Sequence, residues 1–330
     1  MIVITGAGGR LGRQLVEVWR ERNEPVRVVD LIDRPWFDGC ETIIGDIANP
    51  AVVRDAVAGA DIIVHLAEAR PEGELLERLG VAGYDKTVFE VNLGATRRLA
   101  EAARDAGVAR FIYASSESVY GPPPKQCPCS EQTPPAPNGP YGRSKLEAEH
   151  VLLEMHRRGD IEPVILRFAT PLGPFHTSWS RINRLFDLAL RNLPIPVSGG
   201  VGKLKHCVHS RDAVDLIDRC LSRPQAAGRV YNVAGSGAAT VGELIVAVAE
   251  AYDSRSFAVP LPRQFLKAAK FAVDWFDDPF AVPEFKPYPA LHTCYETGRA
   301  LADLGWRARY DTVQTFVEAA IWRRDHFRRV

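Results

Sequence analysis

The 330-residue sequence lacks an excess of charge of either sign, because 41 Lys and Arg balance 41 Asp and Glu. Without net charge, no overall field draws the protein to nucleic acid or to an anionic membrane. The most apolar late segment, residues 265–276, is only twelve residues long and contains three charges, so it is too short and too polar to cross a bilayer. We therefore expect neither nucleic acid nor a membrane as a partner.

Patterns typical of metal sites and disulfide frameworks are also missing. The six cysteines are scattered, with no C-x-x-C pair and no Cys/His spacing typical of zinc. His206 and His209 alternate with apolar residues in a predicted strand and need no metal. The opening residues MIVITGAGG lack a basic leader and a long apolar stretch. We expect reduced thiols, no metal and a cytoplasmic location.

Short apolar runs alternate with helical patterns through the first half of the chain. The runs MIVIT, VRVVD, DIIVHLA, RFIYASS and PVILRF are almost continuously apolar, as strands are when both faces of a parallel sheet are covered. The segments between them have helical periodicity; in one, Ala148, Val151, Leu152 and Met155 form a single apolar stripe. This alternation predicts an α/β fold of the Rossmann type, with a doubly wound parallel sheet.

The alternation weakens after Arg167, where several prolines divide the chain into shorter pieces. The run RVYNVAG, residues 229–235, again looks like a sheet strand. We therefore predict a dinucleotide-binding domain of residues 1–169 and 206–235. A smaller mixed α/β region of residues 170–205 and 236–330 would bind the substrate.

A glycine-rich stretch, TGAGGRLG, follows the first predicted strand and opens the first helix. Gly6 permits a tight turn, Gly9 allows the backbone to approach a pyrophosphate, and Gly12 allows close packing of helix and strand. The helix N-terminus adds N–H donors and a positive dipole. A glycine triplet alone is weak evidence, but its position between strand and helix favours a dinucleotide site over an ordinary turn.

Asp30 ends the second predicted strand, 18 residues after Gly12. A carboxylate there can accept hydrogen bonds from both ribose hydroxyls and repels a 2′-phosphate, so NAD is favoured over NADP. Arg34 is the residue that could still accommodate NADP, and Asp30 could instead be a solvated acid at a strand end. Asp46 and Ile47, in GDI, either approach the adenine or form a plain turn.

Tyr141 and Lys145 lie four residues apart on a predicted helix and share one face. A nearby ammonium stabilises phenolate and lowers the pKa of tyrosine, so the pair can act as an acid or a base. Ser116 ends a predicted sheet strand, where its hydroxyl can hold a substrate oxygen. Such a pair alone is usually ordinary helix surface, but the glycine motif changes that weighting. A serine hydrolase is disfavoured because ASSES lacks a G-x-S-x-G elbow.

Together, TGAGGRLG, VVD, GDI, HLAE, RFIYASSESVYG, YGRSK and LRFATPLGP resemble the extended short-chain dehydrogenase/reductases, which include NAD-dependent epimerases and dehydratases. The resemblance covers nearly the whole chain. It implies that Ser116, Tyr141 and Lys145 are the catalytic residues, with Glu117 as a further candidate, and that Thr170 and Lys205 face the substrate. The residues it implies for the cofactor, together with those argued above, are Gly6, Gly9, Arg10, Leu11, Gly12, Asp30, Asp46, Ile47, Leu66, Ala67, Asn92, Ala114, Tyr141, Lys145 and Phe168.

Three interpretations of the activity stay open. The first is an NAD-dependent oxidoreductase that transfers a hydride between NAD and a secondary alcohol or ketone of a sugar-like molecule. The second is a nucleotide-sugar epimerase or a dehydratase, although Glu117 is followed by Ser118 rather than by the second acid of the dehydratase pattern. The third is a non-catalytic dinucleotide-sensing regulator. The resemblance also implies a homodimer formed through the helices that contain Asn92 and Tyr141.

The chain departs from the nucleotide-sugar epimerases at three points. Thr170 stands where those enzymes usually have an asparagine, and Lys205 stands where they usually have an arginine. Residues 286–300 lack the usual arginine-glycine-aspartate clamp, although Lys286 or Arg299 could replace it. Because bidentate arginine neutralises a diphosphate best, we expect a substrate without a nucleotide and weak binding of UDP-glucose and UDP-galactose.

Overall fold

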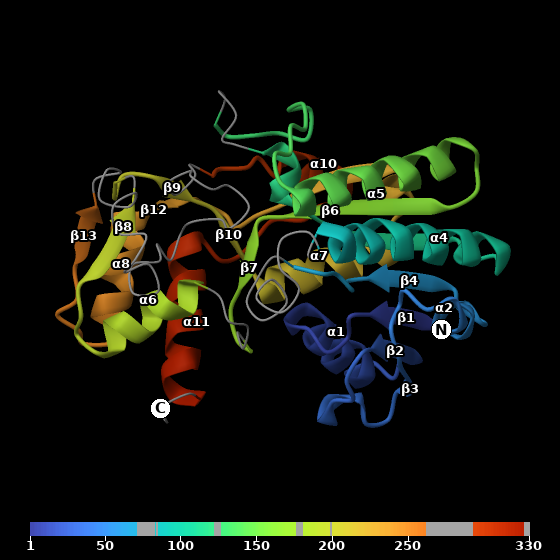
Figure 1. The fold of residues 1–330 in the computed structure, drawn as a ribbon, viewed down its shortest axis with the longest axis horizontal. Coiled ribbons are helices and arrows are strands. Elements are labelled where there is room, and N and C mark those ends of the chain that lie inside the picture. The colour runs from blue at the N-terminus through green and yellow to red at the C-terminus, as the bar shows by residue number, and fades with distance from the viewer. Residues whose placement is uncertain are drawn as a thin grey trace.

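Seven parallel strands form the central sheet of this computed structural model, in the order β11-β6-β5-β4-β1-β2-β3 (Figure 1). The structure describes residues 1–70, 83, 85–121, 127–175, 181–198, 200–261 and 293–326. The strands are β1 (Ile2–Thr5), β2 (Val26–Asp30), β3 (Glu41–Ile44), β4 (Ile62–His65), β5 (Arg110–Ser116), β6 (Glu162–Phe168) and β11 (Arg229–Val233). The predicted doubly wound sheet is confirmed, and its strand order reverses between β1 and β4.

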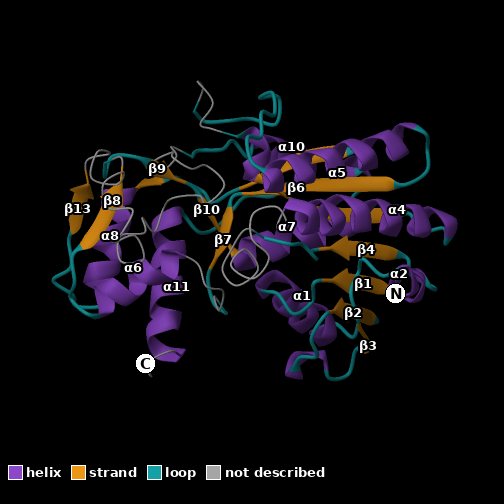
Figure 2. Ribbon diagram, viewed as in Figure 1, coloured by secondary structure: helices purple, strands orange, loops and turns teal. Residues whose placement is uncertain are grey.

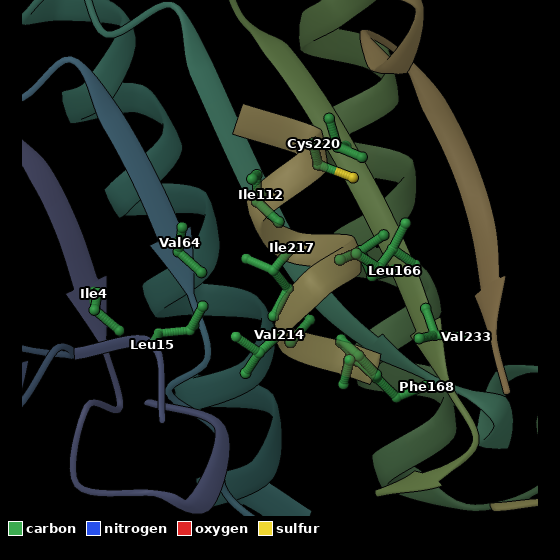
Figure 3. Close-up of a cluster of buried hydrophobic side chains, with 14 of the residues drawn as sticks. Ile4, Leu15, Val64, Ile112, Leu166, Phe168, Val214, Ile217, Cys220 and Val233 are labelled. Atoms are coloured by element: carbon green, nitrogen blue, oxygen red, sulfur yellow. The ribbon is translucent and has the colours of Figure 1, made fainter. Parts of the chain in front are cut away.

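Helices cover both faces of the sheet because its strands are apolar on both. Ile4 on β1 packs with Leu15 of α1 (Arg10–Glu21) and Ile217 of α7 (Ser210–Ser222) (Figure 3). Val3, one residue earlier, packs in a second cluster on the opposite face. That second cluster is covered by α2 (Pro50–Val57), α4 (Thr96–Asp105) and α5 (Pro140–Arg157).

A smaller lobe, on the left in Figures 1 and 2, mixes helices with short strand pairs. Its elements are α6 (Arg181–Leu190), β8 (Ile195–Ser198), β9 (Leu204–Lys205), β12 (Ala239–Thr240), α8 (Val241–Ala251), β13 (Ala258–Leu261) and α11 (Thr312–His326). Phe186, Leu244 and Phe316 belong to its separate core. A parallel pair, β7 (Thr170–Leu172) and β10 (Cys207–His209), lies between the lobe and the large sheet.

The last part of the described chain contributes to both cores. Phe316 on α11 packs in the smaller lobe, whereas α10 (Gly298–Leu304) and Trp306 pack in the core of the large sheet. The indole N–H of Trp306 donates to the carbonyl of Asp212 at 3.2 Å. The division of the chain into two domains stays a prediction, and α10 is a part of the predicted substrate region that packs on the large sheet.

None of the helices within the described ranges is long and apolar enough to pass through a membrane. Residues 265–276, the apolar segment judged too short and too polar to cross a bilayer, lie outside those ranges.

Candidate active site

The glycine-rich turn lies where the strand order reverses, and two of its glycines have no room for a side chain. Gly6 has a left-handed φ of +71°, and a Cβ there would lie 2.6 Å from the backbone nitrogen of Ala67. A Cβ on Gly12 would lie 2.6 Å from the Cα of Ala7. Gly9 precedes the first residue of α1 and donates its N–H to the carbonyl of Gly6 at 3.1 Å. The turn therefore brings bare backbone and a helix N-terminus to the sheet edge, which fits a pyrophosphate.

Asp30, the last residue of β2, points its carboxylate at this turn. Its Oδ2 accepts the N–H of Gly8 at 2.8 Å, and its Oδ1 accepts the N–H of Ile32 at 3.2 Å. Arg34 lies over the ring of Trp36, with 5.7 Å between the guanidinium carbon and the ring centroid. Asp30 is therefore anchored by backbone donors beside the turn, in a position that suits a ribose diol.

The other residues expected at the cofactor have varied surroundings. Asp46 is exposed and its carboxylate accepts the N–H of Ala48 at 2.8 Å, while Ile47 is buried in the core. Arg10 donates to the carbonyl of Pro171, which ties α1 to β7. Leu11, Leu66, Ala67 and Phe168 pack against the two cores of the large sheet.

Tyr141 and Lys145 occupy the first turns of α5, and only 8% and 1% of their respective surfaces are exposed. The Lys145 ammonium donates to the carbonyl of Ala114 on β5 at 2.8 Å. A Cβ on Gly142 would lie 2.5 Å from the carbonyl oxygen of Ser118, so α5 packs directly on the turn that follows Ser116. The structure thus brings Ser116, Tyr141 and Lys145 to the carboxyl end of β5.

Glu68 joins this group, and the sequence analysis did not single it out. Its Oε2 accepts a hydrogen bond from the Tyr141 phenol and pairs with the Lys145 ammonium, both at 2.8 Å. Its Oε1 pairs with Arg70. The available signal was an acid directly after a strand, in HLAE, at the edge where ligands of such sheets bind.

The ionisation of Tyr141 differs from the sequence expectation. Burial, followed by the negative charge of Glu68, raises the pKa of Tyr141 well above its ordinary value, whereas a lowered pKa was predicted. Burial also lowers the pKa of Lys145. For Glu68, burial raises the pKa, but the charges of Arg70 and Lys145 outweigh it and lower the value to about 2. The expectation was wrong because it left out burial, which is the larger cause, and the negative charge of Glu68 beside the phenol.

Asn92 and His65 hold the chain around Glu68 in place. The Asn92 amide bonds both backbone groups of Ala69, with distances of 2.8 and 3.0 Å, and donates to the Ser144 hydroxyl on α5 at 3.2 Å. His65 Nε2 lies 2.9 Å from the hydroxyl of Thr96, which itself donates to the carbonyl of Asn92. His65 therefore donates its Nε2–H to the Thr96 hydroxyl. Burial lowers the pKa of His65 to about 3.

A second polar cluster forms on the smaller-lobe side of Ser116. Thr170 on β7 donates its hydroxyl to Glu117 Oε1 at 3.1 Å. Burial raises the pKa of Glu117 although the Tyr295 phenol, the charge of Lys205 and Thr170 act in the opposite direction. Glu117 and Thr170 thus come together with Lys205 nearby, and Tyr295 is a further residue of this cluster that the sequence did not point to.

Tyr295 is held by rings and backbone contacts. Its ring stacks on Tyr120 and on His206, with centroid distances of 5.8 and 6.2 Å. His206 Nδ1 accepts the N–H of Tyr295 at 3.0 Å, and Nε2 bonds the carbonyl of Gly235 at 2.9 Å. His206 therefore has a structural role. His209 stacks on Tyr310 at 4.0 Å, and no group of metal-ligating side chains occurs in the described part of the chain.

The two replacements proposed for a phosphate clamp do not both lie within the described residues. Arg299 donates to the carbonyl of Val230 at 3.1 Å and lies 3.8 Å from Glu131. Lys286 lies outside the described ranges. Arg299 is therefore engaged with β11 and with the segment that contains Glu131.

Comparison with known proteins gives a consistent result. Residues 2–234 match the model of the NAD-dependent epimerase/dehydratase family. An uncharacterised protein y4nG of Sinorhizobium fredii is 29% identical over 97% of this chain and 78% of its own length. A UDP-glucose 4-epimerase of Vibrio cholerae is 28% identical over 79% of this chain and 78% of its own. The structure of MoeE5 in complex with UDP-glucuronic acid and NAD has a TM-score of 0.79 and 28% identity, covering 98% of this chain and 99% of MoeE5.

Proposed function

The chain belongs to the NAD-dependent epimerase/dehydratase family, and from this premise we propose that it oxidises a secondary alcohol, or reduces the corresponding ketone, of a sugar-like molecule. The observation that carries this proposal is the position of Tyr141 and Lys145. Both are buried on the first turns of α5, against the carboxyl end of β5 where Ser116 lies. A phenol, an ammonium and a hydroxyl at one edge of the sheet can hold a substrate oxygen and move its proton.

Each side chain has a separate task in this proposal. The Ser116 hydroxyl holds the reacting oxygen of the substrate, and Tyr141 exchanges a proton with that oxygen. Asp30 and the glycine-rich turn hold the ribose and the pyrophosphate of the cofactor, and Lys145 holds the second ribose. NAD supplies the hydride acceptor when bound. The dehydratase variant of this chemistry needs a further acid or base, for which Glu117 is the candidate.

The second candidate is a nucleotide-sugar epimerase or dehydratase, and the comparisons favour it. The relative from Vibrio cholerae is a UDP-glucose 4-epimerase, and MoeE5 is seen with UDP-glucuronic acid. Thr170 and Lys205 argue for a substrate without a diphosphate, because Lys205 offers only a point charge. The two candidates share the first hydride transfer, and they differ in the group that carries the reacting alcohol and in whether the hydride returns to the sugar.

Two measurements separate the candidates. Absorbance of NADH is followed while the protein and NAD are mixed with a panel of sugars, sugar acids and UDP-sugars. A net oxidoreductase accumulates NADH. An epimerase converts the sugar without accumulating NADH, and NMR detects that conversion. Calorimetric titration with UDP then tests the nucleotide directly. Micromolar binding of UDP would establish the second candidate, and the absence of turnover with every compound would reject the first.

We also propose a homodimer formed through the helices that carry Asn92 and Tyr141. Light scattering across a range of protein concentrations tests this assembly. A monomer at every concentration would contradict it.

A further inference from the structure

Glu68 occupies the position between the two side chains that the proposed reaction needs. Its Oε2 is 2.8 Å from the Tyr141 phenol oxygen and 2.8 Å from the Lys145 ammonium. Only 12% of the Glu68 side chain and 1% of the Lys145 side chain are exposed, so water screens these charges poorly. A single carboxylate oxygen therefore receives both donors in a largely dry environment.

This geometry fixes which partner carries the proton. The ammonium directs one of its N–H bonds at Glu68 and another at the carbonyl of Ala114. The Glu68 carboxylate therefore offsets the positive charge of the Lys145 ammonium and weakens its effect on the phenol oxygen. The phenol can bond to that carboxylate only as a donor, so it must keep its proton.

We propose that Glu68 is a positioning residue that holds Tyr141 as a protonated donor, and this inference rests on the function proposed above. Reduction of a ketone uses the proton that Tyr141 carries, and oxidation of an alcohol returns a proton to it. Glu68 therefore favours ketone reduction near neutral pH and moves alcohol oxidation to higher pH.

Other charged and titratable groups surround the pair, and they modulate this effect. Arg70 pairs with Glu68 and opposes its influence on Tyr141. Among the described residues, Tyr113, His65 and Glu149 also act on Tyr141, Lys145 or Glu68. Burial keeps His65 neutral and raises the pKa of Tyr113 well above its ordinary value, and Glu149 is bonded to Arg167. Glu68 is thus an anion in direct contact with the phenol.

The test follows the ionisation of Tyr141 by ultraviolet difference absorbance in protein without cofactor. The Tyr141 signal is the difference between each protein and the same protein carrying Tyr141→Phe. In the wild type we expect no Tyr141 phenolate at neutral or mildly alkaline pH. In Glu68→Gln, which keeps the shape and removes the charge, the titration moves to lower pH by at least about one unit. Glu68→Asp, which keeps the charge, restores the wild-type curve.

A matched control is Glu90→Gln, because Glu90 is a half-exposed carboxylate that is also paired with an arginine, Arg98. It should leave the Tyr141 titration unchanged. An unshifted curve in Glu68→Gln would overturn the inference. If that variant does not fold, the wild type still decides, because Tyr141 phenolate at neutral pH would also overturn it.

The proposed function is tested separately by the pH dependence of turnover. Once a substrate is known, the pH of half-maximal alcohol oxidation should also fall by at least about one unit in Glu68→Gln. A shifted titration without turnover on any sugar would leave the inference standing and reject the function. Turnover of a sugar together with an unshifted titration would support the function and reject the inference.

Discussion

Two glutamates at the carboxyl edge of the sheet, Glu68 and Glu117, have opposite ionisation tendencies. Glu68 contacts a guanidinium and an ammonium, and its pKa falls to about 2. Glu117 contacts the phenol of Tyr295 and the hydroxyl of Thr170, and burial raises its pKa although the charge of Lys205 opposes it. Burial disfavours both carboxylates, so cations within hydrogen-bond distance decide the outcome.

This difference divides the site into two halves. The half around Tyr141 contains Glu68, an ionised carboxylate paired with Arg70 and Lys145, and the half around Thr170 contains Glu117, whose pKa is raised. Pairs of acids with separated pKa values are typical of sites that perform proton transfer. The four predictions below test the comparison through single side chains.

The largest effect is expected from Tyr141→Phe, which removes the proton donor from the Glu68 half and leaves Glu117 unchanged. Turnover should fall by about 10²–10⁴-fold, the usual contribution of a general acid or base. Cofactor binding should persist, because the ring stays in place. Steady-state rates and cofactor titration check both points, and a variant with most of its turnover would contradict the assigned role.

The next largest effect concerns acid stability. Because the pKa of Glu68 is about 2 in the folded protein and 4.5 ordinarily, its ion pairs stabilise the fold above pH 4.5. That contribution, up to about 3 kcal/mol, disappears as the pH falls through 4.5 to 2. Denaturant unfolding at several pH values should show a smaller loss on acidification in Glu68→Gln than in the wild type. Equal slopes would contradict the pairing with Arg70 and Lys145.

A third carboxylate, Asp30, is held by backbone N–H groups rather than by cations. Asp30→Asn should weaken NAD binding about tenfold, the value of one hydrogen bond to a charged group. It should also narrow the preference for NAD over NADP, since the charge that repels a 2′-phosphate is gone. Fluorescence titration with both cofactors measures this. Tighter NADP binding by the wild type would assign the pocket to Arg34 instead.

The smallest effect is expected at Glu117, and its sign is opposite to that at Glu68. A raised pKa means that the folded state holds a proton more tightly than the unfolded state does. Stability is therefore lost as the pH rises above 4.5 through the raised value. Glu117→Gln, which stays neutral, should lack this loss while keeping an acceptor for Thr170. Denaturant unfolding of the wild type and of Glu117→Gln at several pH values above 4.5 measures this difference. A wild type that becomes more stable than Glu117→Gln as the pH rises would contradict the raised pKa of Glu117.

The polar interior also contains groups that sequence patterns alone do not reveal. Glu149 and Arg167 form a buried pair at 2.6 Å between α5 and β6, and the hydroxyl of Ser115 donates to Glu149. Neither residue differs in the sequence from a solvated helix acid or a strand-end base. Only their exposure, 1% and 6%, marks them as a structural pair behind the site.

The sequence by itself determined the parts of this protein that depend on neighbouring residues. Alternating apolar runs specify the strands, because both faces of each strand must be buried. The spacing of Gly6, Gly9 and Gly12 specifies the turn, and the i, i+4 spacing places Tyr141 and Lys145 on one helix face. Each of these rules depends only on residues that are close together in the sequence.

The tertiary structure alone decided the chemistry around those residues. Glu68 lies 73 residues from Tyr141 in the sequence, and the pairing of β4 with β5 brings it to the phenol. Tyr295 reaches Glu117 from the far end of the described chain. A pKa depends on charges and on burial through space, and sequence spacing does not encode those distances. For this reason the motif located the tyrosine, whereas the fold determined the direction in which its pKa is shifted.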